Sequence, residues 1–328
     1  MHYDVFNGDA DGILALLQLR KASQLQKAAP QASTLVTGVK RDIQLLDQVA
    51  QQTDVSSVTV LDISMDKNKA ALEALLKRDI PVFYCDHHRT GEVPVVDNFT
   101  ALINTDANTC TSLLINQHLG ERYVAWAIAA AYGDNMVAAA DALCEKHGIA
   151  ADQQTFLNEL GILINYNGYG SSVDDLLFAP ADLYHALLAY DSPFALQADR
   201  TSPYYQLQGG YADDMAKAQA LAPEHTSIES TIYCLPNAAW ARRISGVFGN
   251  QLANQSPEKA HAILTLNPSE QGYTVSVRAP LNQRHGADEI CGQFSTGGGR
   301  KAAAGINLLP KAEINTFIDT LNQYYKAL

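Results

Sequence analysis

The residues of this chain that could carry chemistry gather directly after three short apolar runs with the pattern of buried strands. A Gly-Asp-rich turn follows the first run, a single aspartate the second, and an Asp-His-His triplet the third. They are Asn7, Asp9, Asp11, Asp62, Asp86, His87 and His88. Because the carboxyl ends of parallel strands meet at one edge of a sheet, we expect these side chains to share one rim.

A further aspartate, Asp134, lies at a Gly-Asp break in an Ala-rich helical stretch. Together with Asp9, Asp11 and Asp62 it would bring four carboxylates together, and these cannot all stay ionised without cations. Oxygen and imidazole donors suit Mn²⁺ or Mg²⁺, and Co²⁺ is an alternative. Two such ions, ~3.5–4 Å apart, form a common clamp for phosphoester hydrolysis. We therefore predict a site for two divalent ions, with Mn²⁺ as the expected metal.

Each feature alone has a simpler explanation, since a lone Asp62 is typical of a helix cap and a DxDG turn is typical of a loop. Their coincidence at successive strand ends favours the site. The strings NGDADG (7–12), LDIS (61–64), DHH (86–88) and GD (133–134) resemble the four motifs of the DHH phosphoesterase superfamily. That family includes RecJ-type exonucleases, nanoRNases, cyclic-dinucleotide phosphodiesterases and family II pyrophosphatases, and the resemblance covers nearly the whole chain.

The resemblance implies a role for each position. Asp9 would bind the first metal ion, Asp11 the second, and Asp62 would bridge both. His87 would be the imidazole ligand, with Asp86 as its hydrogen-bond partner, and Asp134 the last carboxylate ligand. His88 would lie near the scissile phosphate, so His88, Asp62 and Asp86 form the expected catalytic group.

Asn7 departs from the family pattern, because the motif HxDxDG has histidine there. Its carbonyl oxygen is a weaker ligand than imidazole, so Asn7 either binds metal loosely or orients a water molecule. A second alignment makes Asn7 and Asp9 the ligand pair and leaves Asp11 to support them. We prefer the first alignment, since it keeps both carboxylates as ligands.

Two other segments are candidates for substrate binding. Residues 108–112 resemble the Ser/Thr-rich start of a helix in the same family, where free N–H groups near Thr109 and Thr111 could bind a phosphate; plain helix capping is the alternative. Residues 295–305, STGGGRKAAAG, resemble the GGGHxxAAG signature of the DHH-associated C-terminal domain. Consecutive N–H groups there could cradle an anion. The expected contacts in that domain are Arg278, Gly297, Gly298, Gly299 and Arg300.

The arrangement of elements predicts an α/β protein with two domains. Apolar runs alternate with helical patterns in the first half, which indicates a doubly wound parallel sheet. A second, smaller α/β pattern begins near residue 228. We expect a catalytic domain at 1–190, a linker at 191–225 and a substrate-binding domain at 226–328, with the active-site cleft between the domains.

Composition limits the function. The chain has 328 residues and a net charge of −12, which argues against binding long nucleic acid through a broad basic face. Five scattered cysteines and no apolar stretch of membrane length predict a protein of the reducing cytoplasm. We expect the protein to bind a small nucleotide and not to bind a membrane. The sequence leaves open whether it forms a homodimer.

These observations favour a metal-dependent phosphodiesterase that cleaves short 5′-phosphorylated oligonucleotides. A linear dinucleotide such as pGpG or pApA, as formed in nanoRNase-type RNA decay or c-di-GMP signalling, is the expected substrate. The alternatives are a cyclic-dinucleotide phosphodiesterase, a phosphatase for 3′,5′-bisphosphorylated nucleotides, a RecJ-like exonuclease and a nucleotide-binding protein without activity.

Overall fold

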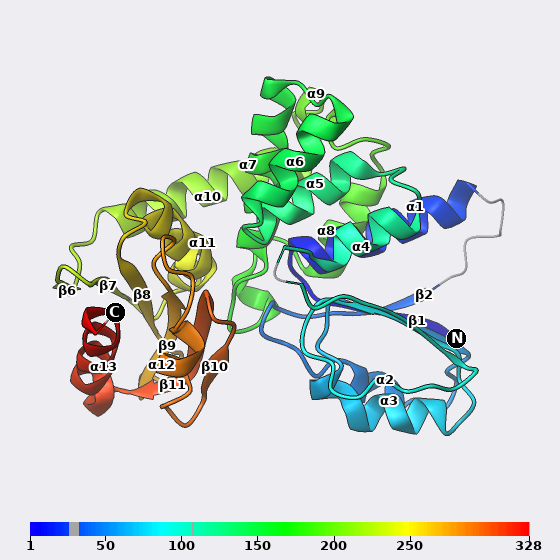
Figure 1. Cartoon of the computed structure of the whole chain (residues 1–328). Helices are drawn as coiled ribbons and strands as arrows, with labels where there is room; N and C mark the ends of the chain where they lie inside the picture. Colours follow the sequence, from blue (N-terminus) through cyan, green and yellow to red (C-terminus); the bar gives the residue numbers. More distant parts are fainter. Residues whose placement is uncertain (26–32, 107, 328) are drawn as a thin grey trace. The chain divides into compact units, whose positions relative to one another are not determined.

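The computed structural model describes residues 1–25, 33–106 and 108–327. The chain divides into two compact units, coloured along the sequence in Figure 1. Unit 1 comprises Met1–Gly168 and Ser172–Gln208, and unit 2 comprises Tyr169–Ser171 and Gly209–Leu328. Each unit has its own sheet, and each is described separately below.

Unit 1 is built on a parallel sheet of five strands in the order β2-β1-β3-β4-β5. The strands are β1 (His2–Phe6), β2 (Ser33–Val36), β3 (Ser57–Leu61), β4 (Val82–Asp86) and β5 (Phe99–Ile103). The chain turns to one side of β1 to form β2 and then crosses to the other side to form β3. Ligands of such sheets bind beyond the carboxyl ends of the strands at this reversal.

Helices cover both faces of this sheet (Figure 1). Those of unit 1 are α1 (Ala10–Leu25), α2 (Leu46–Ala50), α3 (Lys69–Leu76), α4 (Thr111–His118), α5 (Val124–Gly133), α6 (Val137–His147), α7 (Ala151–Asn167), α8 (Pro180–Leu188) and α9 (Ala195–Ala198). Apolar side chains of α2 and α3 pack on one face, in a core that contains Val5, Val60 and Tyr84. On the other face α1 contacts β1 and α4 contacts β4. The expected doubly wound α/β sheet is therefore confirmed.

Two close approaches place the segments that follow the strands. A Cβ on Gly8 would lie 1.9 Å from the carbonyl oxygen of Gly38, so the loops after β1 and β2 touch. A Cβ on Gly133 would lie 2.6 Å from Cβ of Ala10 and 2.7 Å from the oxygen of Gly161. Glycine at these positions lets α5 end against α1 and α7, and this brings Asp134 to the start of α1.

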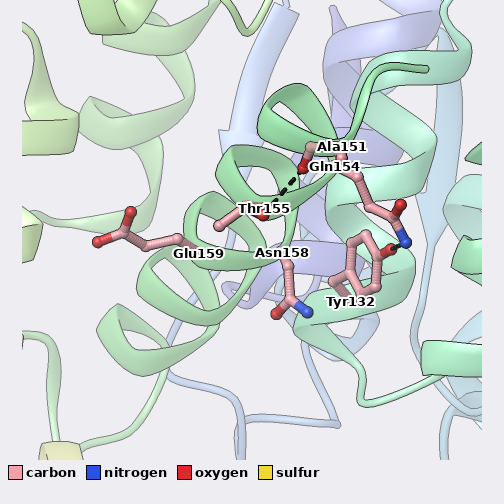
Figure 2. A pocket seen from close by; sticks show the side chains of 6 residues that line it. All are labelled: Tyr132, Ala151, Gln154, Thr155, Asn158 and Glu159. Atoms are coloured by element: carbon pink, nitrogen blue, oxygen red, sulfur yellow. Dashed lines mark hydrogen bonds between the residues drawn. The ribbon is translucent and has the colours of Figure 1, made fainter.

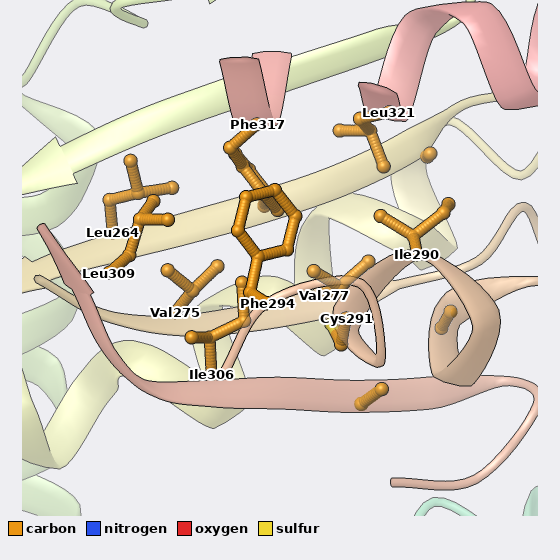
Figure 3. Close-up of a cluster of buried hydrophobic side chains, with 14 of the residues drawn as sticks. Leu264, Val275, Val277, Ile290, Cys291, Phe294, Ile306, Leu309, Phe317 and Leu321 are labelled. Atoms are coloured by element: carbon orange, nitrogen blue, oxygen red, sulfur yellow. The ribbon is translucent and has the colours of Figure 1, made fainter. Parts of the chain in front are cut away.

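Unit 2 has a mixed sheet in the order β10-β11-β9-β8-β7-β6. Its strands are β6 (His225–Thr226), β7 (Ser230–Leu235), β8 (Ala260–Leu266), β9 (Gly272–Arg278), β10 (Gly297–Gly299) and β11 (Ala303–Pro310). Its helices are α11 (Ala239–Gln255), α12 (Ala287–Cys291) and α13 (Ile314–Lys326). Figure 3 shows its core, where the rings of Phe294 and Phe317 pack edge to face among aliphatic side chains of the sheet. The two ring centroids are 5.8 Å apart.

The structure differs from the expected elements in three places. Within 191–225, where we expected a linker, the chain forms α9 and α10 (Pro203–Gln219), and the division between the units falls inside α10. The polar segment 165–172 predicts a break in the helical pattern, but α7 continues to Asn167, whose side chain bonds to the backbone of Leu177 and Phe178. Residues 26–28, at the end of the first expected helix, lie outside the described residues.

The third difference is in the Gly-rich segment of unit 2, which forms strands β10 and β11 and not a turn. Its Ala-Gly composition lacks the β-branched residues that indicate strands in a sequence.

The five cysteines are free thiols, and four of them are buried. Within the described residues, no helix combines the length and the apolar character needed to cross a bilayer.

Candidate functional site

The predicted ligands of unit 1 lie together at the carboxyl edge of its sheet. Asp9 and Asp11 follow β1, Asp62 follows β3, and His87 follows β4. Asp134 reaches the same place from the end of α5. The side chains of these five residues are all at least nine-tenths buried. The sheet therefore concentrates four carboxylates and an imidazole in a small volume with little access to water.

Asp9 is held by the loop that begins α1. Its Oδ1 accepts the N–H groups of Asp11 and Gly12 at 3.0 and 3.1 Å, and its Oδ2 contacts the ammonium of Lys40 at 2.5 Å. Burial would raise the pKa of Asp9, but the charge of Lys40 outweighs it and lowers the pKa. Asp9 is consequently ionised and fixed in orientation.

Asp11 links the segment after β1 to the start of α4 through hydrogen bonds. Its two carboxylate oxygens accept the N–H groups of Thr111 and Ser112, each at 2.7 Å. These N–H groups are therefore not available for a phosphate, which corrects our expectation for the segment containing Thr109 and Thr111. The positive end of helix α4 therefore stabilises the buried carboxylate.

The orientation of His87 is fixed by Thr109, whose carbonyl oxygen lies 2.9 Å from Nδ1. A carbonyl only accepts, so Nδ1 carries a proton, and the lone pair of the ring, where Nε2 is unprotonated, belongs to Nε2. Nε2 lies 3.4 Å from Asp62, 3.8 Å from Asp11 and 3.9 Å from Asp134. A lone pair that faces three carboxylates requires a cation between them, either a proton or a metal ion.

Asp86 does not pair with His87, contrary to our expectation. Its Oδ1 bonds to Nδ1 of His88 at 2.8 Å, because the Thr109 carbonyl already occupies Nδ1 of His87. Burial would lower the pKa of His88, but the hydrogen bond to Asp86 and the charge of Asp62 outweigh it and raise the pKa. His88 is one-third exposed and is the more accessible of the two histidines.

Asp62 lies at the centre of the cluster in a strained conformation. Its φ is +58°, in the left-handed region that non-glycine residues seldom adopt, and such a residue costs ~1–3 kcal/mol. Burial raises the pKa of Asp62 well above its ordinary value, and the charges of Asp11 and Asp9 raise it further. Asp62, His87 and His88 each offer a donor atom within 4.8 Å of the others. The strained backbone thus aims a carboxylate at neighbours that repel its charge.

These residues fit a divalent metal ion. The amide nitrogen of Asn7 donates to the Lys40 carbonyl at 3.3 Å, which directs Oδ1 the other way. This buried Oδ1 has no hydrogen-bond partner among the residues that the structure describes. An orphaned oxygen, an imidazole lone pair and a repelled carboxylate are each satisfied by a hard or borderline cation.

Sequence analysis missed two residues of the site. Lys40 follows β2, and its ammonium contacts Asp9, Asp134 at 3.5 Å and Asn165 at 3.0 Å. The rule that located the other residues applies to it, since β2 also ends at this edge of the sheet. Asn165 is buried near the end of α7, in a polar-aromatic run of residues 165–170 whose composition suits the lining of a cleft but does not by itself indicate a site.

The expected substrate contacts of unit 2 have different surroundings. Gly297–Gly299 pair with Gly305 and its neighbours in an edge strand, where successive N–H groups alternate in direction and so do not form the expected cradle. The guanidinium of Arg278 donates to Asn250, Ser276 and Gly246 at 2.5, 2.9 and 3.1 Å. Arg300 is exposed. The roles of these residues in substrate binding stay predictions.

A pocket of about 450 Å³ lies on α5 and α7, away from the predicted ligands. In Figure 2, Gln154 points toward Tyr132, whereas Glu159 points away. Glu159 accepts hydrogen bonds from Tyr204 and Gln208. No predicted ligand lines this pocket, so the candidate site remains the acidic cluster at the edge of the sheet.

Comparison with known proteins supports the motif analysis through structure alone. No family model matches the chain, and no curated protein matches its sequence. RecJ from Thermus thermophilus, solved with Mn²⁺, matches all of this chain at 16% identity and a TM-score of 0.65. The match covers 52% of RecJ, so this chain spans about half the length of that structure.

Two further structures extend the match. The DHH domain of a member of a family of ribosomal proteins matches 98% of this chain and 86% of its own, at 12% identity and a TM-score of 0.62. The chain has the DHH fold. PggH from Vibrio cholerae, a pGpG-specific phosphodiesterase, covers 100% of this chain and 99% of its own, at 14% identity and a TM-score of 0.56. The resemblance predicted from the four motifs is thus confirmed at the level of the fold.

Proposed function

We propose that this chain is a metal-dependent phosphodiesterase that hydrolyses short 5′-phosphorylated oligonucleotides, most readily linear dinucleotides such as pGpG or pApA, to mononucleotides. The observation that carries the proposal is the lone pair of His87 Nε2, which faces three carboxylates at 3.4–3.9 Å. The Thr109 carbonyl keeps a proton on Nδ1, so Nε2 is the ring nitrogen that can bind a cation among these carboxylates. Residues held in this way are prepared for metal binding.

Asp9, Asp11, Asp62, His87 and Asp134 would hold two divalent ions, and the orphaned oxygen of Asn7 makes it a further candidate ligand. Bound Mn²⁺ or Mg²⁺ would supply an activated water molecule and stabilise charge on the phosphoryl oxygens. The chain's own residues do the positioning: Thr109 orients His87, and the start of α4 orients Asp11. These contacts keep the ligands in place before the metal ions arrive.

His88 is the proposed proton donor. Asp86 holds its Nδ1 and, with Asp62, keeps the pKa of His88 raised. A protonated His88 would present Nε2–H to the substrate, where it could stabilise phosphoryl charge or protonate the leaving oxygen. Its exposure, greater than that of His87, suits contact with a substrate.

The preference for short substrates rests on two observations. The match to PggH, a pGpG-specific phosphodiesterase, covers nearly the full length of both chains, and a RecJ exonuclease bound to manganese is matched over 90% of its length. The net charge of −12 disfavours a long basic track for nucleic acid. Arg278, Gly297–Gly299 and Arg300 stay the proposed substrate contacts in unit 2, and the proposed setting is the cytoplasm.

Hydrolysis of a length series tests the proposal. The panel contains 5′-phosphorylated di-, tri-, penta- and decanucleotides, cyclic di-GMP, cyclic di-AMP and adenosine 3′,5′-bisphosphate, each with Mn²⁺ and with a chelator. We expect rapid Mn²⁺-dependent cleavage of the dinucleotides and a steep decrease with length.

Each alternative activity gives a different pattern in the same assay. Preference for the decanucleotide would indicate a RecJ-like exonuclease, and preference for the cyclic substrates a cyclic-dinucleotide phosphodiesterase. Release of inorganic phosphate from the bisphosphate alone would indicate a nucleotide phosphatase. Nucleotide binding without turnover of any substrate would contradict the enzymatic proposal.

A further inference from the structure

Lys40 places a positive charge inside the acidic cluster. It lies in the loop after β2, and the contact of Gly8 with Gly38 holds this loop against the loop after β1. Its ammonium contacts Asp9 at 2.5 Å, Asn165 at 3.0 Å and Asp134 at 3.5 Å. Only 24% of the Lys40 side chain is exposed, so these ionic contacts are weakly screened.

The cluster has a second group of donors. Asp62, His87 and His88 offer donor atoms within 4.8 Å of one another. The Lys40 ammonium contacts Asp9 and Asp134, whereas Asp62 faces two imidazoles, with His87 Nε2 at 3.4 Å and His88 Nδ1 at 3.7 Å. A lysine of the chain itself therefore already neutralises one part of the cluster, and the other part offers imidazole donors to a metal ion.

We propose that Lys40 is an internal counter-cation that competes with one of two divalent ions, so that the chain binds these ions with unequal affinity. This inference rests on the metal centre of the proposed function. An ion coordinated by Asp62 and His87 relieves the repulsion among the carboxylates without displacing the ammonium of Lys40. An ion coordinated by Asp9 or Asp134 has to compete with the ammonium for the same oxygens.

The competition with Lys40 should lower the affinity of the second ion by a measurable factor. A divalent ion at Asp9 must first separate an ammonium from two buried carboxylates and a buried amide. Breaking a close pair of this kind commonly costs at least ~1.4 kcal/mol, which is about tenfold in affinity. Replacing Lys40 by Met keeps most of the aliphatic stem and removes the charge. We therefore expect Lys40→Met to tighten the weaker site about tenfold or more and to leave the tighter site within about threefold.

Titration of Mn²⁺, followed by the electron paramagnetic resonance signal of the free ion, measures both sites without any substrate. The proteins are wild type, Lys40→Met and Lys77→Met, the last of which removes an exposed lysine that faces Glu73 at 4.0 Å. We expect two unequal sites in wild type and in Lys77→Met, and two nearly equal sites in Lys40→Met. Unchanged or weakened binding of the second ion in Lys40→Met would overturn the inference.

A second measurement uses the wild-type protein and does not depend on the folding of a variant. Lysines are acetylated with an amine-reactive ester, with and without Mn²⁺, and quantified by peptide mass spectrometry. Displacement by the second ion should increase the acetylation of Lys40 severalfold at Mn²⁺ concentrations that fill the weaker site, while Lys77 stays constant. Equal or lower acetylation of Lys40 with Mn²⁺ would contradict displacement.

The outcomes separate this inference from the proposed function. Two sites of unequal affinity that do not respond to Lys40→Met would overturn the role of Lys40 and leave the phosphodiesterase proposal standing. The expected Mn²⁺ behaviour together with no hydrolysis in the length series would overturn the phosphodiesterase proposal and support the role of Lys40. Absence of Mn²⁺ binding by every protein would overturn both.

Discussion

Two buried aspartates of the same sheet, Asp4 in β1 and Asp62 after β3, have opposite surroundings. Asp4 accepts hydrogen bonds from Arg20, whose Nε lies 2.9 Å from Oδ2 and whose Nη2 contacts Oδ1. His2 lies 3.1 Å from the same Oδ1. Asp62 is as deeply buried, but its charged neighbours include Asp11 and Asp9, which repel it.

The pKa values of the two carboxyl groups record this difference. Burial would raise both, but the hydrogen bonds from His2 and Arg20 outweigh burial and lower the pKa of Asp4. At Asp62 the other carboxylates add to the effect of burial, and the pKa rises. A buried charge that is paired with an opposite charge of the chain is part of the fold. A buried charge that is surrounded by like charges indicates a candidate ligand site.

Replacing Asp62 by Asn should produce the largest effect on activity. Asn tolerates the left-handed backbone at this position and removes only the charge. If Asp62 bridges two metal ions as proposed, its loss removes several kcal/mol of transition-state stabilisation, so Mn²⁺-dependent hydrolysis of a dinucleotide should fall by about 10³-fold or more. Steady-state kinetics at saturating Mn²⁺ measures the decrease.

The same substitution should make the metal-free protein more stable. Removal of a repelled buried charge should add about 1 kcal/mol, equal to roughly 2–4 °C in melting temperature in the presence of chelator. Opposite signs for activity and stability are the specific expectation for an uncompensated charge. A variant that melts below wild type under these conditions would show that Asp62 is compensated in the same way as Asp4.

Replacing Arg20 by Met should give the reverse pattern. It leaves Asp4 buried without its charged partner, and breaking a buried ion pair costs about 3 kcal/mol, at the low end of the usual range because Arg20 is one-fifth exposed. Urea unfolding measures the loss. Hydrolysis per folded molecule should stay at the wild-type level.

Arg78→Met is the matched control for Arg20→Met. Arg78 is exposed and donates to the carbonyl groups of Ala50 and Gln52, so its loss should change stability by less than about 0.5 kcal/mol. Equal destabilisation by the two substitutions would remove the distinction between a buried, compensating arginine and a surface arginine.

The sequence predicts which residues gather in the acidic cluster better than it predicts the contacts that support them. Asp9, Asp62 and His87 could be placed because they follow apolar runs, and parallel strands carry such residues to one edge. Lys40 follows the same rule but was missed because a lysine after a short strand is not a typical metal ligand. Asn165 and the carbonyl of Thr109 act through packing between segments distant in the chain, and no local pattern records this.

The limit of structure prediction from this sequence is clearer in unit 2. Apolar periodicity predicts an α/β pattern from about residue 228, but it does not reveal β10 and β11, since Gly297–Gly299 and Ala303 are typical of loops. These glycines are needed for packing: a Cβ on Gly297 would lie 1.7 Å from the Cys291 carbonyl oxygen. A run of glycines can therefore serve close packing as well as anion binding, and only the coordinates distinguish the two.

Asp86 is an intermediate case, because this buried carboxylate has a histidine as its partner. Asp86→Asn removes the charge that helps to raise the pKa of His88 while an oxygen remains to accept from Nδ1. We expect hydrolysis at neutral pH to fall about 10–100-fold, and the alkaline limb of the pH–rate profile to move to lower pH. Asp66→Asn, at an exposed aspartate, is the control. An unshifted limb in Asp86→Asn would rule out His88 as the proton donor that Asp86 supports.

The acid stability of the protein gives the smallest effect in this series. The pKa of Asp4 is lower in the folded chain than its ordinary value of 3.8, so the unfolded chain binds the proton more readily. The stabilisation by ionised Asp4 is thus fully present above about pH 5 and is lost as the pH falls below 3.8 through the folded pKa. The loss amounts to about 1.4 kcal/mol for every pH unit that separates the unfolded pKa from the folded pKa.

Comparison of wild type with Asp4→Asn isolates this contribution, because the other carboxyl groups titrate in both proteins. Urea unfolding with chelator, between about pH 7 and about pH 3, should show a stability difference that is constant down to about pH 5 and shrinks below about pH 4. A difference that stays constant down to the lowest pH would mean that Arg20 and His2 contribute to the fold without depending on the charge of Asp4. In that case compensation of buried charge would not explain why one aspartate of this sheet is structural and the other is available to a metal ion.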